Sequence, residues 1–123
     1  MILGFKDIFV PAVVAGTKPH TIRSGNRWKV GTPIQFYHSV RQRDMAKIRP
    51  DGMARVVQKI EIKWGGGQQP CLLINGRCLT PLECQELSRR DGFGDFAELL
   101  RFIDQVHGLP FKGQLVGWTN LRY

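Results

Sequence analysis

The segment from Gly16 to Arg23 constrains the fold of this chain most, because it forces a change from helix to strand. Gly16 accepts a positive φ at no steric cost, so it suits the end of the short apolar helix that the preceding residues predict. Pro19 disfavours helical geometry at Lys18 and keeps the backbone extended. From His20 onward, the residues alternate in character as they do in a β-strand. The chain is therefore expected to combine helices with strands.

The polar side chains of this segment are expected to converge. If His20 and Ile22 face the core, Thr21 and Arg23 point together to the other side of the strand, with Lys18 just ahead of them. An ammonium, a hydroxyl and a guanidinium near one spot suit a phosphate, a carboxylate or the polar edge of a base. The alternative is a basic loop on a solvated surface.

The charge of the chain favours a polyanionic partner. It has 18 Lys and Arg residues against 10 Asp and Glu residues, a formal net charge of +8, which points to nucleic acid above all. Between residues 18 and 49 the only acidic residue is Asp44, and the cations are Lys18, Arg23, Arg27, Lys29, Arg41, Arg43, Lys47 and Arg49. Trp28, Phe36 and Tyr37 are interleaved with them and could stack bases. Alternatively, these aromatics are core and the cations only confer solubility.

Several classes of protein and site are not expected. No apolar run approaches the roughly 18 residues that a membrane span needs, and no signal peptide is recognisable, so we expect a cytoplasmic protein without membrane partners. The odd count of cysteines, at Cys71, Cys78 and Cys84, argues against a disulfide framework, and their spacing fits no zinc knuckle. We expect neither a metal site nor a cofactor, and buried thiols for at least two of the cysteines.

The pattern along the chain predicts an α+β fold with more strands than helices. We predict strands over 2–5, 20–23, 34–40, 53–64, 70–74, 77–79 and 111–121. A short helix after Asp7 ends at Gly16, and later helices cover about 81–89 and 96–106. Turns are expected at 50–52 and 75–76, and a hairpin loop at 65–67. A small curled sheet or barrel with flanking helices is the natural packing, and 123 residues suit one domain over 1–123.

Several stretches resemble the ASCH domain, the activating-signal-cointegrator homology family. The similarity lies in the string Ala-Gly-x-Lys-x-x-Thr-Ile-Arg at 15–23, the opening at 2–5, the turn at 28–31 before a strand, and Asp91-Gly92-Phe93 before a helix. Their order and spacing hold over nearly the whole chain. The resemblance implies a PUA-like small β-barrel flanked by about three helices. It also implies recognition of RNA or a nucleotide in a cleft between the barrel and the helices.

The resemblance further implies a possible enzymatic activity. Some small bacterial members of the family are amidohydrolases that remove the acetyl group of N4-acetylcytidine with a lysine, a threonine and a glutamate. The first two fall on Lys18 and Thr21, whereas the glutamate falls at or near Asp91, a carboxylate one methylene shorter. In such a reaction, a desolvated Lys18 beside Arg23 would take a proton from Thr21, and Asp91 would orient Lys18 or the cytosine amine.

We therefore expect a protein that binds RNA or a modified nucleoside, as a monomer or weak homodimer. The expected binding residues are Lys18, His20, Thr21, Arg23, Trp28, Tyr37 and Arg41, and the expected catalytic residues are Lys18, Thr21 and Asp91. Three mechanisms remain open. They are a non-catalytic RNA-binding module, an N4-acetylcytidine amidohydrolase, and a metal-independent single-strand ribonuclease in which His20, Lys18 and Arg41 act on the phosphate.

Overall fold

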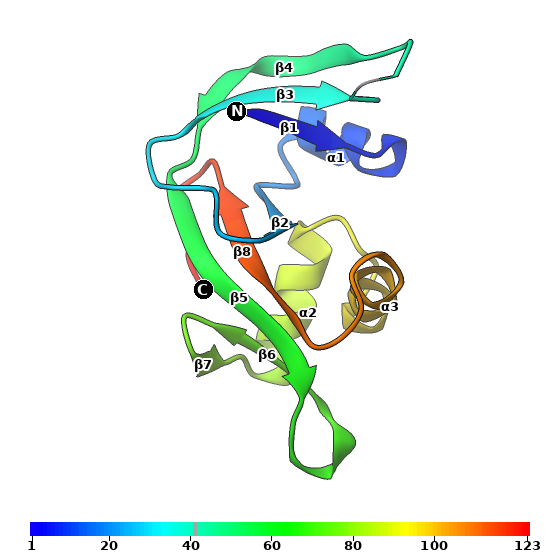
Figure 1. Cartoon of the computed structure of the whole chain (residues 1–123), viewed down its shortest axis with the longest axis vertical. Coiled ribbons are helices and arrows are strands. Elements are labelled where there is room, and N and C mark those ends of the chain that lie inside the picture. Colours follow the sequence, from blue (N-terminus) through cyan, green and yellow to red (C-terminus); the bar gives the residue numbers. More distant parts are fainter. Residues whose placement is uncertain (41) are drawn as a thin grey trace.

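Two β-sheets and three α-helices make up this computed structural model, which describes residues 1–40 and 42–123 (Figure 1). One sheet has the order β1 (Ile2–Phe5), β3 (Pro33–His38) and β4 (Ala46–Met53). The other has the order β2 (His20–Ser24), β8 (Phe111–Gly117), β5 (Val56–Trp64), β6 (Pro70–Ile74) and β7 (Arg77–Cys78). The helices are α1 (Val10–Ala15), α2 (Pro81–Arg90) and α3 (Phe96–Val106), with short 3-10 segments η1 (Asp7–Phe9) and η2 (Gly66–Gln68).

The predicted α+β class and its three helices are confirmed, and the strands are arranged as two sheets. Within the described residues the ladders join three and five strands, and no closed barrel is formed. β1 and β3 run parallel, whereas the other neighbouring strands are antiparallel. β8 lies between β2 and β5, and residues 114–118 are buried without a break.

The turn predicted at Pro50-Asp51-Gly52 is wrong, because these residues belong to β4. β4 is at the edge of its sheet, where a proline without an N–H is tolerated. The register with β3 also shifts on both sides of Phe36. A Cβ on Gly52 would lie 3.1 Å from the Phe36 ring, so the glycine lets β4 cross this buried side chain.

The predicted helix boundaries are largely confirmed. Gly16 ends α1 with a φ of 81°. Thr80 and Glu83 form a reciprocal capping box at the start of α2, and the Asp95 carboxylate accepts the Glu98 N–H at the start of α3. Asp7 does not cap a helix by its side chain, since it lies within η1.

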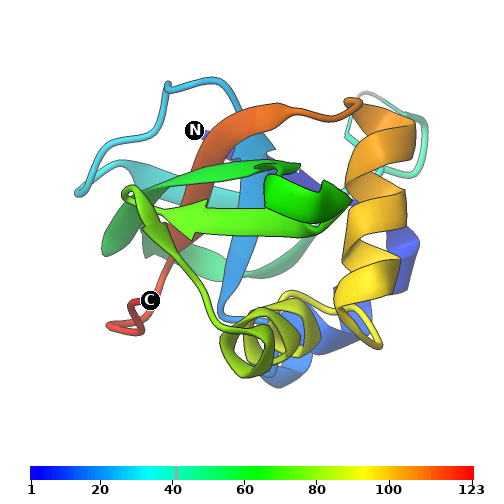
Figure 2. The same cartoon turned by 90° about the horizontal axis from the view of Figure 1, so that it is seen from below.

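The two sheets share one hydrophobic core, and the helices cover its flank. Trp118 joins the sheets, with its ring centroid 5.0 Å from that of Phe36 and 6.0 Å from that of Phe5. Figure 2 shows α2 and α3 along the side of the five-stranded sheet. Leu115 and Trp118 are both buried in this core. Among the described residues, no helix has the length and apolar character that a membrane span requires.

Candidate functional site

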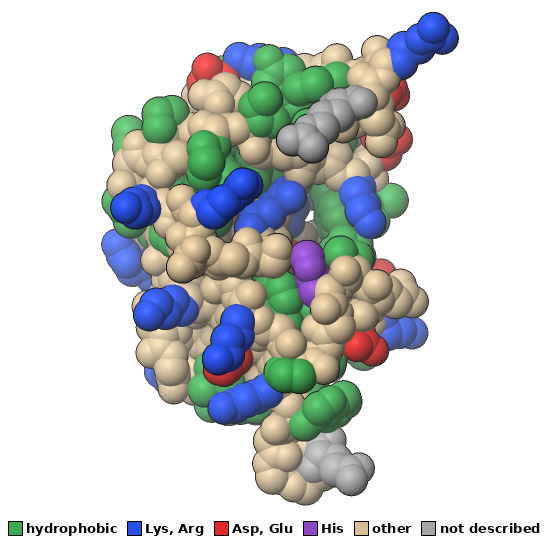
Figure 3. All heavy atoms as spheres, viewed as in Figure 1, with side chains coloured by type: hydrophobic (Ala, Val, Ile, Leu, Met, Phe, Trp, Pro, Cys, Tyr) green, Lys and Arg blue, Asp and Glu red, His purple; other side chains and the backbone are tan. Residues whose placement is uncertain are grey.

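A pocket of about 370 Å³ opens where the two sheets meet α3. Its walls come from β1 and η1, from β2 and the loop after it, from the α2–α3 turn, and from the last turns of α3. Figure 3 shows a hollow on this face, with Lys and Arg side chains around it. The segment from Gly16 to Arg23 therefore contributes Lys18 and residues 21–23 to the lining of this pocket.

Lys18 is one of the most buried side chains of the described residues, with 1% of its surface exposed. Its Nζ donates to the backbone oxygen of Asp91 at 2.5 Å and lies 3.1 Å from the carboxylate Oδ1 of the same residue. The ammonium also lies 5.0 Å from the centroid of the Phe9 ring. Because the Lys18 N–H donates to Ala12 O in α1, the helix end sets where this lysine enters the pocket. A basic loop on a solvated surface is therefore excluded for Lys18.

Asp91 reaches Lys18 because of how α2 ends. It is the C-cap residue of α2, and its N–H donates to Leu87 O at 2.9 Å. Gly92 follows with a φ of 102°, and a Cβ there would lie 2.9 Å from the Phe9 ring. The glycine is needed for both its conformation and its small size. This tight turn gives Lys18 a backbone oxygen as well as the carboxylate, which compensates for the short aspartate side chain.

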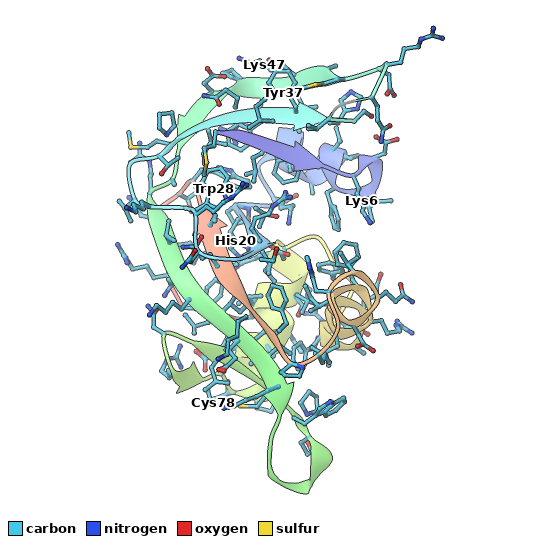
Figure 4. The ribbon with its side chains drawn as sticks, in the orientation of Figure 1. Lys6, His20, Trp28, Tyr37, Lys47 and Cys78 are labelled. Atoms are coloured by element: carbon cyan, nitrogen blue, oxygen red, sulfur yellow. The ribbon has the colours of Figure 1, made fainter. Side chains whose placement is uncertain are left out.

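His20, which the sequence predicted as a binding residue on a strand whose face toward His20 and Ile22 would be core, is 2% exposed and belongs to the same polar cluster, but it is not among the residues that line the pocket. Its Nδ1 lies 2.8 Å from Asp91 Oδ1 and its Nε2 lies 2.7 Å from the Tyr123 hydroxyl. An ionised carboxylate only accepts hydrogen bonds, so we infer that Nδ1–H donates to Asp91 and Nε2 accepts from Tyr123. Figure 4 labels His20 between β2 and the helices.

Tyr123 is held by hydrogen bonds at its side-chain hydroxyl and at its backbone. Its backbone N–H and C=O exchange two hydrogen bonds with the side-chain amide of Gln58 on β5, at 3.1 and 3.0 Å. Burial raises the pKa of the Tyr123 phenol, against the opposing effect of Arg90. The phenol therefore stays protonated and can donate to His20 over the ordinary pH range.

Thr21 and Arg23 line the pocket from β2, together with Ile22 between them. Thr21 is 6% exposed, and its hydroxyl makes no hydrogen bond to the residues that the structure describes. Arg23 donates to Gly4 O at 2.6 Å and stacks on Phe5 at 5.3 Å. Its Nε is buried and has no partner in the described part of the chain. Among the described residues, the pocket lining therefore includes the Thr21 hydroxyl without a hydrogen-bond partner, next to an Arg23 side chain whose Nε is unpaired.

The electrostatic setting of Lys18 is unusual for an ion-paired lysine. Burial lowers the pKa of Lys18, and this effect outweighs the stabilisation of the ammonium by Asp91, while Arg23 lowers the pKa further. Burial also lowers the pKa of Arg23, which Asp91 opposes. Lys18 therefore loses its proton more readily than an exposed lysine does, which is the property that a general base needs.

For three of the predicted binding residues, Trp28, Tyr37 and Arg41, the structure does not show a side chain that is free to bind a ligand in the pocket. Trp28 lines the pocket but is 5% exposed, and its backbone is held by two hydrogen bonds of 2.9 Å to the Gln114 amide. Tyr37 lies on β3, with Lys47 Nζ 6.0 Å from its ring centroid, and Figure 4 shows both far from His20. Arg41 lies outside the described residues.

Sequence reasoning missed the aromatic wall and the basic rim of the pocket. The rings of Phe9, Phe93 and Phe102 pack together with centroids 5.3 to 5.8 Å apart. Lys6 and Arg27 are exposed at the rim, and Lys6 Nζ lies 4.9 Å from the Phe102 centroid. The Asp-Gly-Phe string was the available signal for Phe93. The sequence around Phe102 on α3 gave no sign that this side chain lines a pocket and is not an ordinary core residue.

No family model matches this chain, and comparisons with curated proteins and with solved structures gave no match. Among the described residues, no group of three or more His, Cys, Asp or Glu side chains is placed to hold a metal ion.

Proposed function

We propose that this protein binds a modified pyrimidine nucleoside, free or within RNA, and hydrolyses an amide on its base. The observation that carries the proposal is the buried Lys18–Asp91 pair at the wall of an open pocket, next to Thr21. Buried ion pairs contribute little net stability, and perturbed titratable groups in a cleft mark functional sites. The sequence resemblance to ASCH domains supports the same function. We propose that the two sheets correspond to an open PUA-like barrel.

The shape and charge of the pocket support a nucleoside as the ligand. The wall formed by Phe9, Phe93 and Phe102 is apolar and offers aromatic surface against which a base can lie. The rim cations Lys6 and Arg27 are exposed and suit a ribose phosphate or a neighbouring nucleotide of RNA. A base that lies against these rings on the side of the pocket would bring its exocyclic substituent toward Lys18 and Thr21.

The proposed reaction is acyl transfer through Thr21. The neutral amine of Lys18 takes the proton of the Thr21 hydroxyl as its oxygen bonds to the amide carbonyl carbon. The resulting ammonium returns this proton to the base nitrogen as the C–N bond breaks, and water then hydrolyses the acyl-threonine ester. Arg23 provides positive charge for the developing oxyanion. Asp91 holds Lys18, and His20 and Tyr123 act as positioning residues for Asp91.

The test is the release of cytidine and acetate from N4-acetylcytidine by the purified protein. Replacement of Thr21 by valine, which keeps the shape of the side chain, should lower kcat at least about hundredfold, as loss of a nucleophile requires. Thr17→Val is the matched control, because Thr17 is exposed one residue before Lys18 and should keep full turnover. Turnover that persists in Thr21→Val with a folded protein contradicts the mechanism.

The pH dependence tests the role of Lys18. Because burial lowers the pKa of Lys18 below its usual 10.5, the neutral amine becomes populated at lower pH than in an exposed lysine. We expect kcat/KM to rise with pH and to level off below pH 10.5, and Lys18→Met should show no turnover at any pH in this range. A kcat/KM that falls as the pH increases toward this range would refute proton abstraction by Lys18.

A second candidate function, RNA binding without catalysis, is favoured by the exposed cations outside the pocket, among them Lys29, Arg43 and Lys47. It predicts binding of single-stranded RNA that weakens with salt, with no release of cytidine. The ribonuclease alternative is not proposed, because both ring nitrogens of His20 are already bonded to Asp91 and Tyr123. Cleavage of single-stranded RNA by the purified protein would reverse that choice.

A further inference from the structure

Two cysteines face each other across the β6–β7 hairpin. Leu73 pairs with Cys78 in the ladder, and Cys71 lies two residues before Leu73, so its side chain is on the same face and diagonal to Cys78. The two Sγ atoms are 2.8 Å apart. The prediction of at least two buried thiols is wrong, since Cys78 is exposed, Cys71 is half-buried and Cys84 alone is buried.

The hairpin holds this pair by its backbone. The turn at Asn75 and Gly76 has positive φ angles of 49° and 84°, and the Leu79 N–H donates to Leu72 O beyond the ladder. Formation of a disulfide needs the sulfurs to approach to about 2.0 Å. Because the two sulfurs are already 2.8 Å apart, they need to approach by less than about 1 Å to reach that length.

The third cysteine differs in its reactivity. Cys84 is on α2, 4% exposed, and burial raises the pKa of its thiol to about 11. Cys78 is exposed, and its hydrogen bond to Cys71 raises the pKa of Cys71. The thiolate is the reactive form of cysteine, so reaction starts at Cys78 and Cys84 stays out of it.

We propose that Cys71 and Cys78 are a reversible dithiol–disulfide site that is oxidised by a low-molecular-weight disulfide such as glutathione disulfide. The Cys78 thiolate attacks one sulfur of the oxidant, whose S–S bond breaks and releases one thiolate. Cys71 then loses its proton and attacks Cys78 Sγ, and the second thiol of the oxidant leaves. Two protein thiols are oxidised to one disulfide, and the oxidant is reduced to two thiols that carry the two protons.

The disulfide would act on the element that carries the candidate site. It ties β7 to β6 directly before Thr80, which caps α2, and α2 ends at Asp91. A cross-link of this kind stabilises the folded protein mainly by restricting the unfolded chain. The proposal stands independently of the proposed hydrolase activity, because it concerns thiols that do not line the pocket.

The experiment treats the purified full chain with excess glutathione disulfide and counts free thiols after denaturation. The count should fall from the three cysteines of the sequence to one, with a peptide that links Cys71 to Cys78, and dithiothreitol should restore all three. The oxidised protein should also melt at a higher temperature than the reduced protein. Cys84→Ser should still form the disulfide.

Two single variants separate the steps. Cys71→Ser should stop at a stable mixed disulfide of glutathione with Cys78, whereas Cys78→Ser should react slowly and show no rise in melting temperature. Three free thiols after treatment of the unmodified chain would overturn the proposal. So would a stable mixed disulfide in that chain, a linkage that includes Cys84, or a disulfide between two chains.

Discussion

Two lysine–aspartate pairs in this protein have the same chemistry and opposite surroundings. Lys18 and Asp91 lie 3.1 Å apart, with side chains that are 2% and 4% exposed. Lys47 and Asp51 on the edge strand β4 lie 2.5 Å apart, with side chains that are 44% and 54% exposed. By distance alone, the pair on β4 would be the stronger one.

The difference in burial reverses the effect of the aspartate on the lysine. The hydrogen bond to Asp51 raises the pKa of Lys47, as expected for a cation that keeps its water. Burial lowers the pKa of Lys18 although Asp91 accepts from it. The charges of the exposed pair are therefore stabilised mainly by water, whereas the lysine of the buried pair loses its proton more readily than an exposed lysine does. Access to water, more than the distance between charges, distinguishes a candidate site from a surface contact.

The largest effect should come from breaking the buried pair. Lys18→Met leaves the Asp91 carboxylate buried without its cation, which costs about 3–5 kcal/mol in the free energy of unfolding, and it should abolish turnover. Lys18→Met combined with Asp91→Asn removes both charges and should recover most of the lost stability, still without turnover. Denaturant unfolding and cytidine release measure the two effects. If the double variant is as unstable as the single one, the cost comes from packing and the ion pair is not its cause.

A smaller effect should come from the outer part of the same cluster. Tyr123→Phe leaves His20 Nε2 without its donor, at a cost of about 1–3 kcal/mol for an unsatisfied buried group. If Tyr123 positions Asp91 through His20, kcat should fall with KM unchanged, and the rising limb of the pH profile should shift. Tyr37→Phe is the matched control on β3 and should leave kcat and the pH profile unchanged. A fall in stability with an unaltered kcat and pH profile would reduce Tyr123 to a structural role.

The smallest effect should come from the exposed pair. Lys47→Met removes a cation that water already stabilises, so the unfolding midpoint and the turnover of the free nucleoside should stay within error of the unmodified protein. Chemical denaturation at low and high salt checks this. A loss of stability as large as that of Lys18→Met would break the distinction between the two pairs.

Much of the local structure could be predicted from the sequence because its causes are local. Gly16 and Pro19 set the change from helix to strand, and Thr80 with Glu83 starts α2 through a capping box. These effects act within a few residues. The wrong turn at Pro50 shows the limit of prediction from local sequence. A proline breaks a central strand but is tolerated on an edge strand. Whether a strand lies at an edge depends on the order of the strands in the sheet, which is not a local property.

The sequence by itself determined the α+β class, most of the helix and strand boundaries, and the grouping of Lys18, Thr21 and Arg23 around one strand. Only the tertiary structure decided that Lys18 is buried, that Asp91 contacts both Lys18 and His20, and that Tyr123 completes the cluster, although Lys18 and Asp91 are 73 positions apart in the sequence. The physical reason is that burial depends on the packing of distant elements. The pKa of Lys18 is set mainly by its burial, and burial cannot be seen from the residues next to it in the sequence.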